Sequence, residues 1–394
     1  MELTNKQQEG LKIALQRHRD CEKYTVISGY AGTGKSTLVR FIIEALDVEE
    51  SKVCYAAFTG KAAEVLRKKG NRNVCTLHKL LYDHFPRPAG GFFRKPKPKI
   101  DYDVVVVDEV SMAPKTLMDL LLSHRCYVIC LGDPFQLPPI DKDEDNGLLE
   151  HPHIFLDEVM RQAKESEIIR LTMDIREGNP IEYKHSGNEV LIFEEKNLNT
   201  GMLTWADQIL VGTNATRISI NNQMRAMQGF EGGPQEGDKV ICLRNYWEEF
   251  SIEEADPLVN GTIGYLQNGF KTFRDFPYYI KADTHRFDVW QANFIVGEDY
   301  YPALELDYNM LVKGEKCCDW RLAYQLNKLK PKIGEVVPKE FAYAYAITCH
   351  KAQGSEWDKV LVLEERFPFD KEEHARWLYT ACTRASEKLI LVRK

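Results

Sequence analysis

A glycine-rich octapeptide near the N-terminus has the residue types and spacing of a phosphate-binding loop. Residues 29–36 read GYAGTGKS and fit the pattern G-x-x-x-x-G-K-[ST] without exception. A strand-like run precedes them and a helix-like run follows, so backbone N–H groups can converge on phosphate oxygens. The lysine would face the β- and γ-phosphates and the serine hydroxyl would bind Mg²⁺. The motif predicts a nucleotide site formed by Gly29, Ala31, Gly32, Thr33, Gly34, Lys35, Ser36 and Thr37.

The second part of the expected site is the run VVVVDE at residues 104–109. Four valines predict a buried central strand, and Asp108 follows at its carboxyl end, where ligands bind in open α/β sheets. We expect Asp108 to hold Mg²⁺ and Glu109 to orient and deprotonate a water molecule. Because a water nucleophile needs an adjacent base, this pair favours hydrolysis over phosphoryl transfer to a small acceptor.

A third motif, LGDPFQ, occupies residues 131–136 at the end of the next strand-like run. A glutamine at the position of Gln136 can contact the γ-phosphate and report its presence, while Asp133 and Pro134 shape the loop. In isolation, an ordinary exit from a strand into a turn would be the simpler interpretation. The motif gains its meaning from its place after the first two.

The segments that must position these residues alternate between strand-like and helix-like patterns. Apolar strand candidates occur at residues 24–28, 53–58, 104–108 and 127–131, each followed by a turn and a helix-like stretch. This alternation predicts an α/β fold with a parallel sheet wrapped by helices. A second alternation begins near Gln208 with QILVGT, resumes near Lys359 with KVLVLEE and ends with KLILVRK.

Two stretches interrupt the alternation. Residues 67–99 contain ten Lys or Arg and one acid, and PRPAGGFFRKPKPK within them predicts a short β-ribbon. A solvated basic loop is the alternative interpretation of this composition. Residues 237–338 contain short strand-like runs that indicate a small inserted β-barrel: KVICLRN, GTIGYLQN, YYIKA, NFIVG and ALELDY.

The composition is that of a globular protein in the cytoplasm. The 394 residues are 44% hydrophobic and 28% charged, with a formal net charge of −7. A global count does not exclude nucleic acid, because binding depends on local potential. The ten cysteines lack zinc-site spacing, so reduced thiols are expected. The polar N-terminus has no secretory signal, and no apolar run is long enough for a bilayer, so we expect no membrane partner.

With these motifs in this order, the sequence resembles superfamily 1 helicases, in particular the branch containing RecD and the phage Dda helicase. Residues 3–7 resemble the Q motif, 346–356 motif V of the RecD-like branch, and 378–385 motif VI. The resemblance implies two RecA-like lobes with two insertions. They are lobe 1A (1–82 and 100–170), the 1B hairpin or pin (83–99), lobe 2A (171–236 and 338–394) and an SH3-like 2B barrel (237–337).

The resemblance also assigns residues around the nucleotide. It places Gln7 on the adenine and Glu356 near the nucleotide, and it lets Arg161 and Arg384 reach the γ-phosphate of ATP. Both arginines lie far from residues 29–36 in sequence. An arginine across a cleft stabilises charge on the transferring phosphate only when the lobes close. ATP binding would therefore hold the lobes together, and hydrolysis would release them.

Contacts with the nucleic-acid strand follow from the same resemblance. Two phenylalanines, Phe92 and Phe93, are candidates for stacking on the base pair at the duplex junction. Packing of a hairpin aromatic on its own stem is the alternative for both. The remaining strand contacts are assigned to Thr59, Lys61, Thr76, His78, Thr213, Asn214, Thr348, His350 and Lys351.

The expected function is that of a monomeric helicase that depends on ATP and Mg²⁺. The resemblance implies 5′-to-3′ translocation on single-stranded DNA, unwinding at junctions of single and double strands, and weak sequence preference. An RNA or RNA–DNA helicase is one alternative, because no residue decides about a 2′-hydroxyl. A P-loop phosphotransferase is disfavoured by Glu109 and Arg384. A non-catalytic nucleic-acid-binding module is disfavoured by the intact set of catalytic residues.

Overall fold

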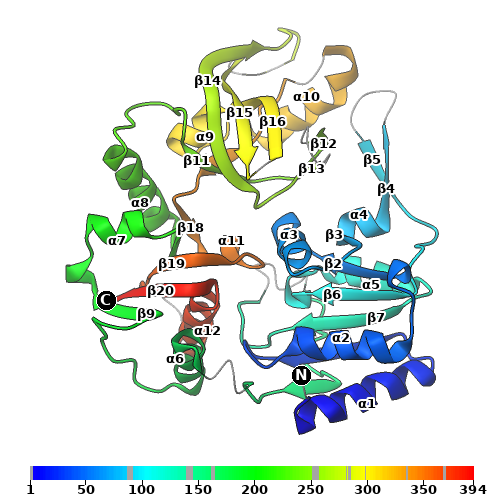
Figure 1. Cartoon of the computed structure of the whole chain (residues 1–394). Coiled ribbons are helices and arrows are strands. Elements are labelled where there is room, and N and C mark those ends of the chain that lie inside the picture. Colours follow the sequence, from blue (N-terminus) through cyan, green and yellow to red (C-terminus); the bar gives the residue numbers. More distant parts are fainter. Residues whose placement is uncertain are drawn as a thin grey trace. The chain divides into compact units, whose positions relative to one another are not determined.

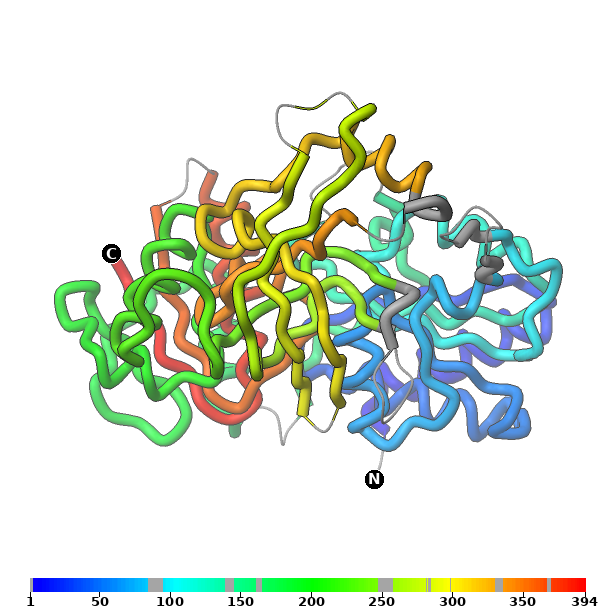
Figure 2. The backbone as a smooth tube through the Cα atoms, turned by 90° about the horizontal axis from the view of Figure 1, so that it is seen from above, coloured from blue at the N-terminus to red at the C-terminus, as the bar shows by residue number. Residues whose placement is uncertain are grey.

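The chain forms two compact units in the computed structural model. The first unit comprises Met1–Tyr82, Pro96–Asn214 and Ile347–Lys394, and the second comprises Asp83–Lys95 and Ala215–Ala346. Figure 2 shows the same backbone turned by 90°, coloured from blue at the N-terminus to red at the C-terminus. The structure describes residues 3–86, 92–138, 145–160, 165–250, 257–280, 282, 285–297, 299–333, 336–366 and 370–394.

The first sheet of the first unit is fully parallel and has the strand order β3-β2-β6-β7-β1-β8 (Figure 1). All four strands expected in the first half of the sequence are present. The strands are β1 (Tyr24–Gly29), β2 (Val53–Ala57), β3 (Val74–Thr76), β6 (Val104–Asp108), β7 (Tyr127–Gly132) and β8 (Ile154–Leu156).

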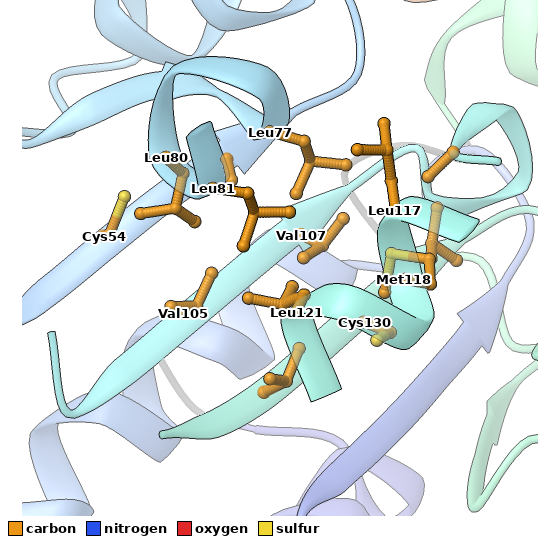
Figure 3. Close-up of a cluster of buried hydrophobic side chains, with 14 of the residues drawn as sticks. Cys54, Leu77, Leu80, Leu81, Val105, Val107, Leu117, Met118, Leu121 and Cys130 are labelled. Carbon is orange, nitrogen blue, oxygen red and sulfur yellow. The ribbon is translucent and has the colours of Figure 1, made fainter. Parts of the chain in front are cut away.

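Helices cover both faces of this sheet, so its strands are apolar on both sides. Val105 and Val107 pack with Leu81 and Leu121 on one face (Figure 3), and Val104 and Val106 join the core on the other. The helices are α1 (Asn5–Arg19), α2 (Lys35–Leu46), α3 (Gly60–Lys68), α4 (Leu77–Leu81) and α5 (Lys115–Ser123).

A second sheet in strand order β18-β10-β19-β20-β9 is formed by later segments of the chain. The strands expected near Gln208, Lys359 and the C-terminus are confirmed. The strands are β9 (Val190–Glu194), β10 (Gln208–Val211), β18 (Ala346–Thr348), β19 (Trp357–Leu363) and β20 (Ala385–Arg393). The helices are α6 (Glu167–Glu177), α7 (Thr200–Trp205), α8 (Asn214–Met227), α11 (Cys349–Ala352) and α12 (Lys371–Cys382).

The second unit contains an antiparallel sheet in strand order β16-β15-β14-β11-β17. Its strands are β11 (Lys239–Cys242), β14 (Ile263–Asp275), β15 (Arg286–Val296), β16 (Asp299–Asp307) and β17 (Phe341–Tyr343). Two further pairs are β4 (Tyr82–Pro86) with β5 (Phe92–Pro96), which is the expected ribbon, and β12 (Tyr246–Phe250) with β13 (Pro257–Leu258). The assignment of the larger sheet to an SH3-like barrel stays a prediction.

Two expectations for this insertion were wrong. The described residues of the run YYIKA, 278–280 and 282, are not in a strand, because Pro277 precedes a turn in which Tyr278 and Tyr279 are 86% and 70% exposed. The sequence analysis also missed two helices, α9 (Tyr308–Lys313) and α10 (Trp320–Ile333). Leu322, Leu326 and Leu329 repeat at helical spacing in α10 and pack into a core cluster. Among the described helices, none is long and apolar enough to cross a membrane.

A buried ion pair connects α8 with the start of the antiparallel sheet. Arg225 Nε lies 2.9 Å from Asp238 Oδ1, and the two side chains are 8% and 0% exposed. The arginine also donates to the carbonyl oxygens of Gly232 and Gly233, and Tyr345 donates to Asp238. Each charge therefore has several polar partners in place of water, which a buried pair requires.

We expect Asp238→Ala to lower the free energy of unfolding by about 3–5 kcal/mol, because it leaves the Arg225 charge buried and unpaired. Asp275→Ala, which removes an exposed pair with Arg286 in the same unit, is the matched control and should cost below about 1 kcal/mol. Urea unfolding followed by circular dichroism measures both. Equal losses for the two variants would contradict the role given to the buried pair.

Candidate nucleotide-binding and catalytic site

The phosphate-binding loop connects β1 with α2 and contains two glycines in the left-handed region. Gly32 has φ +75° and Gly34 has φ +78°. A Cβ on Gly34 would lie 2.4 Å from Met160 Sδ and 2.5 Å from Gln7 Nε2, so a larger residue would have to displace both side chains as well as adopt the left-handed backbone. Lys35 Nζ donates to the carbonyl oxygens of Gly29 (2.7 Å) and Tyr30 (3.0 Å), which holds the ammonium group at the loop.

Gln7 lies against this loop and is 1% exposed. Its Oε1 accepts from the backbone N–H of Thr4 (3.0 Å) in a capping box at the start of α1. Its Nε2 donates to the carbonyl oxygens of Thr33 (3.3 Å) and Gly34 (3.4 Å). The expected adenine-binding residue is therefore beside the loop, where its amide braces the loop backbone. Its contact with adenine stays a prediction.

Asp108 is the last residue of β6 and Glu109 follows it, at the carboxyl end of the sheet from which the loop also leaves. Glu109 has φ +50°, a left-handed conformation that is uncommon for a residue with a side chain and often marks a functional site. Its backbone N–H donates to Asp108 Oδ1 (3.0 Å). Burial, and secondly the charge of Glu109, raise the pKa of Asp108, while the charges of Lys69 and Lys35 oppose the rise.

The oxygen atoms in this region suit Mg²⁺. Ser36, Thr37 and Asp108 line one cavity of about 640 Å³, together with Lys69. A serine hydroxyl and a carboxylate are hard oxygen donors of the kind that bind Mg²⁺ alongside phosphate oxygens. A cation beside Asp108 would also offset the unfavourable burial of its charge. The residues present therefore fit the ion.

Arg384 reaches this site from the second sheet. Its guanidinium group is almost fully buried, and Nη1 lies 3.9 Å from Glu109 Oε1. The same group donates to the carbonyl oxygens of Thr380 and Ser355, which fixes its orientation. The structure thus brings together Lys35, Asp108, Glu109 and Arg384. Arg161 lies outside the described residues.

Gln136 and Glu356 lie on the loops that flank this arrangement. Gln136 is buried and lines a cavity of about 380 Å³ with Asp133 and Arg376. Glu356 is exposed, and its Oε2 lies 3.8 Å from Lys69 Nζ. Both positions are compatible with the expected roles, which stay predictions.

A group of side chains that was not predicted from the sequence joins residues 133–137 to α12 and to the residue after α11. Tyr379 donates to Asp133, and Thr380 Oγ1 accepts from the backbone N–H of Leu137 (2.9 Å). Arg376 donates to the carbonyl oxygen of Pro134 (3.2 Å), and Gln353 donates to that of Leu137 (2.7 Å). The positions of residues 376, 379 and 380 on one helical face were the available signal.

The candidate nucleic-acid-binding residues of the first sheet lie near the carboxyl ends of neighbouring β-strands. Thr59 follows β2, Thr76 is the last residue of the adjacent parallel strand β3, and each hydroxyl caps the next helix. Lys61 forms an ion pair with Glu64 (2.7 Å). His78 stacks on Tyr82.

Residues of motif V (346–356) lie close to these candidates at the start of α3. A Cβ on Gly354 would lie 3.0 Å from Ala62 Cβ and 3.3 Å from Thr59 Oγ1, so the backbone there passes close to α3. Thr348 ends β18, and Lys351 is exposed. Burial lowers the pKa of His350, which favours the neutral ring.

The remaining candidates follow β10 or lie on the ribbon. The backbone N–H and hydroxyl of Thr213 both donate to the Glu365 carboxylate (2.9 Å each), and Asn214 begins α8. Thr213 therefore has a protein partner in this structure, and its backbone is held in place. The side chains of Phe92 and Phe93 lie outside the described part of the chain.

Comparison with known proteins agrees with this arrangement. An AAA domain model matches residues 2–191, and a UvrD-like helicase C-terminal domain model matches residues 343–392. The ATP-dependent RecD2 DNA helicase of Deinococcus radiodurans is 27% identical over 388 residues, which cover 93% of this chain and 46% of that protein. The ATP-dependent DNA helicase dda of Enterobacteria phage T4 is 30% identical over 191 residues, 45% of this chain and 43% of that protein.

Solved structures share the fold. A Pif1 helicase from a study of DNA unwinding at forked duplexes aligns with a TM-score of 0.54 and 18% identity, covering 99% of this chain and 92% of that one. Bacteroides Pif1 in complex with ADP-AlF3 and single-stranded DNA aligns with a TM-score of 0.52 and 17% identity over the same shares. The chain spans less than half the length of the two curated relatives. On its motifs, site and relatives, the chain is similar to superfamily 1 helicases, with the RecD2 and dda helicases among its relatives.

Proposed function

We propose that this chain is an ATP-dependent DNA helicase that moves along single-stranded DNA. The observation that carries the proposal is the approach of Arg384 to Glu109, because it pairs an arginine beside the second sheet with the expected base beside the first. An arginine placed in this way stabilises charge on the transferring phosphate. Both curated relatives are named ATP-dependent DNA helicases, which supports DNA as the substrate.

Each residue of the site has a distinct part in the proposed hydrolysis. Backbone N–H groups of residues 32–36 bind the phosphates, and Lys35 moves from the loop carbonyls onto the β- and γ-phosphates. Ser36 and Asp108 would hold Mg²⁺, which would neutralise part of the phosphate charge. Glu109 orients the attacking water and takes its proton. Arg384, with Arg161 as a second arginine, stabilises the charge that develops on the γ-phosphate.

Movement along the nucleic acid requires that the ATPase site be coupled to the residues expected to bind the nucleic-acid strand. Gly354 passes close to Thr59 and Ala62, and Ser355, next in sequence, accepts a hydrogen bond from Arg384. A change at the γ-phosphate therefore has a short path to the residues expected to contact the strand, through one hydrogen bond, one peptide unit and one packing contact. Because those contacts are to phosphates and base faces, we expect binding with weak sequence preference.

Finer features of the proposal rest on the resemblance. They are 5′-to-3′ polarity, a 1B pin formed by β4 and β5 that opens the duplex at a junction, an SH3-like 2B insertion, a monomeric state and a cytoplasmic location. An RNA or RNA–DNA helicase is the second candidate. Strand-displacement assays on duplexes with 5′ or 3′ tails of DNA or RNA decide polarity and substrate together.

Steady-state ATP hydrolysis should be stimulated at least about tenfold by single-stranded DNA in the presence of Mg²⁺. Lys35→Ala should abolish the stimulated rate, because the phosphates lose their positive partner. Hydrolysis that is equal with DNA, with RNA and without nucleic acid would exclude a strand-coupled motor and direct attention to a small-molecule acceptor.

Arg384→Ala should lower kcat by about 10³-fold or more while changing ATP affinity only a few-fold, since the arginine acts on charge in the transition state. Arg170→Ala, which removes an exposed arginine of α6, serves as the control and should leave kcat unchanged. Stopped-flow hydrolysis and binding of a fluorescent ATP analogue provide the two readouts. A loss of affinity without a loss of kcat would refute the assignment of Arg384.

Asp108→Asn should stop hydrolysis yet stabilise the fold without Mg²⁺. Because the pKa of Asp108 is raised in the folded chain, ionisation above that pKa costs stability, and the neutral amide avoids this cost. We expect Tm to rise by about 2 °C or more at pH 8 in EDTA. The difference should shrink as the pH falls through the shifted pKa towards about 3.9, the ordinary aspartate value. Asp119→Asn, at an exposed position of α5, should leave Tm unchanged; an equal rise there would contradict the explanation.

A further inference from the structure

One buried hydroxyl group connects three parts of the proposed ATPase site. Tyr379 on α12 has no exposed surface. Its hydroxyl donates to Asp133 Oδ2 (2.6 Å) and accepts from the backbone N–H of Ala31 in the phosphate-binding loop (2.8 Å). The hydroxyl thus donates to the LGDPFQ motif and accepts from the phosphate-binding loop at the same time.

The surroundings of this hydroxyl leave it little freedom to move. The Tyr379 ring packs edge-to-face on Phe135, with 5.2 Å between ring centroids. Thr380 and Arg376, on the same side of α12, bond the backbone of Leu137 and Pro134. The helix is therefore fixed to residues 133–137 at several points. Among those contacts, only the Tyr379 hydroxyl also bonds the loop that binds phosphate.

Asp133, which accepts the hydrogen bond from this hydroxyl, is influenced by other groups of the site. Asp133 Oδ1 accepts from the backbone N–H of Phe135 (3.0 Å), so both carboxylate oxygens have a donor. Burial raises the pKa of Asp133, while the charge of Lys35 and the bond from Tyr379 oppose the rise. Without the hydroxyl, a buried carboxylate oxygen and a loop N–H would each lose a partner, which is unfavourable.

Arg384 lies five residues after Tyr379, and its Nε donates to the carbonyl oxygen of Thr380 at the end of the same helix. We propose that Tyr379 is a positioning residue of the ATPase reaction. Its hydroxyl sets the distance between the phosphate-binding loop and the helix end that presents Arg384, and it acts through that arginine. The inference rests on the proposed hydrolysis of ATP and extends it to a residue outside the phosphate-binding loop and outside the candidate strand-binding residues.

Tyr379→Phe tests the role of the hydroxyl, because the ring and its packing on Phe135 are retained. We expect kcat for ATP to fall about tenfold or more and KM for ATP to change less than about threefold, since the loss falls on the transition state. A variant with unchanged kcat would overturn the inference.

Tyr127→Phe is the matched control for a purely structural effect. Tyr127 is also buried in the first unit, and its hydroxyl contacts Thr25 (2.5 Å) and the carbonyl oxygen of Ala14 (2.9 Å). Both variants thus remove a buried hydroxyl with two partners, and both should lower Tm. Only Tyr379→Phe should lower kcat. Equal kcat losses in the two variants would show that the effect is general destabilisation.

A double-mutant cycle tests whether Tyr379 acts through Arg384. In an Arg384→Ala background, measured by single-turnover hydrolysis, Tyr379→Phe should reduce the rate further by less than about twofold. A full tenfold loss in that background would overturn the proposed route, because the two effects would then be independent.

Binding of a transition-state mimic separates this inference from the helicase proposal. Without any nucleic acid, Tyr379→Phe should weaken binding of ADP with aluminium fluoride about tenfold and leave binding of ADP alone within about twofold. Hydrolysis that ignores DNA, together with this selective loss, would reject the helicase proposal and support the positioning role. DNA-stimulated hydrolysis with unaltered binding of the mimic would do the reverse.

Discussion

The parallel packing of β1, β6 and β7 is the constraint on which the rest of the site depends. Parallel strands end at a common edge, so the residues that follow them are neighbours whatever their separation in sequence. Asp108 ends β6, Lys35 and Asp133 come after β1 and β7, and the three charges lie close enough to affect one another. The strands can stay in the middle of the sheet because helices cover both faces, and Val104–Val107 supply apolar side chains to each.

Helix α12, which packs with the second sheet, adds side chains to the site at the carboxyl ends of these strands. The same side of α12 bonds residues 133–137 through Arg376, Tyr379 and Thr380 and then presents Arg384 to Glu109. Hydrogen bonds in a buried, low-dielectric setting are directional and expensive to leave unmade. The joint between the two sheets is therefore sensitive to small displacements. That sensitivity is what a site needs if it is to respond to one phosphate group.

Local patterns in the sequence predicted much of the fold and part of the site. The four strands of the first half and the ribbon were predictable, because apolar runs and Gly-Pro turns are local signals. Residues 320–333 were misjudged because the short apolar runs around them resemble strands, although Leu322, Leu326 and Leu329 follow a helical period. The strand expected at Tyr278 failed because Pro277 begins a turn.

The sequence by itself determined which chemical groups are available: a lysine in a glycine-rich loop, paired acids after a buried strand and an arginine in a recognisable motif. These groups can be identified from residue types and from their short spacings along the chain. Only the tertiary structure decided that Tyr379 bonds both Asp133 and Ala31, that Gln7 braces the loop, and that Arg384 faces Glu109. The physical reason is that such bonds join residues far apart in the chain, 246 positions for Tyr379 and Asp133. The helical spacing of residues 376, 379 and 380 marks a common face, but it does not identify the partners of that face.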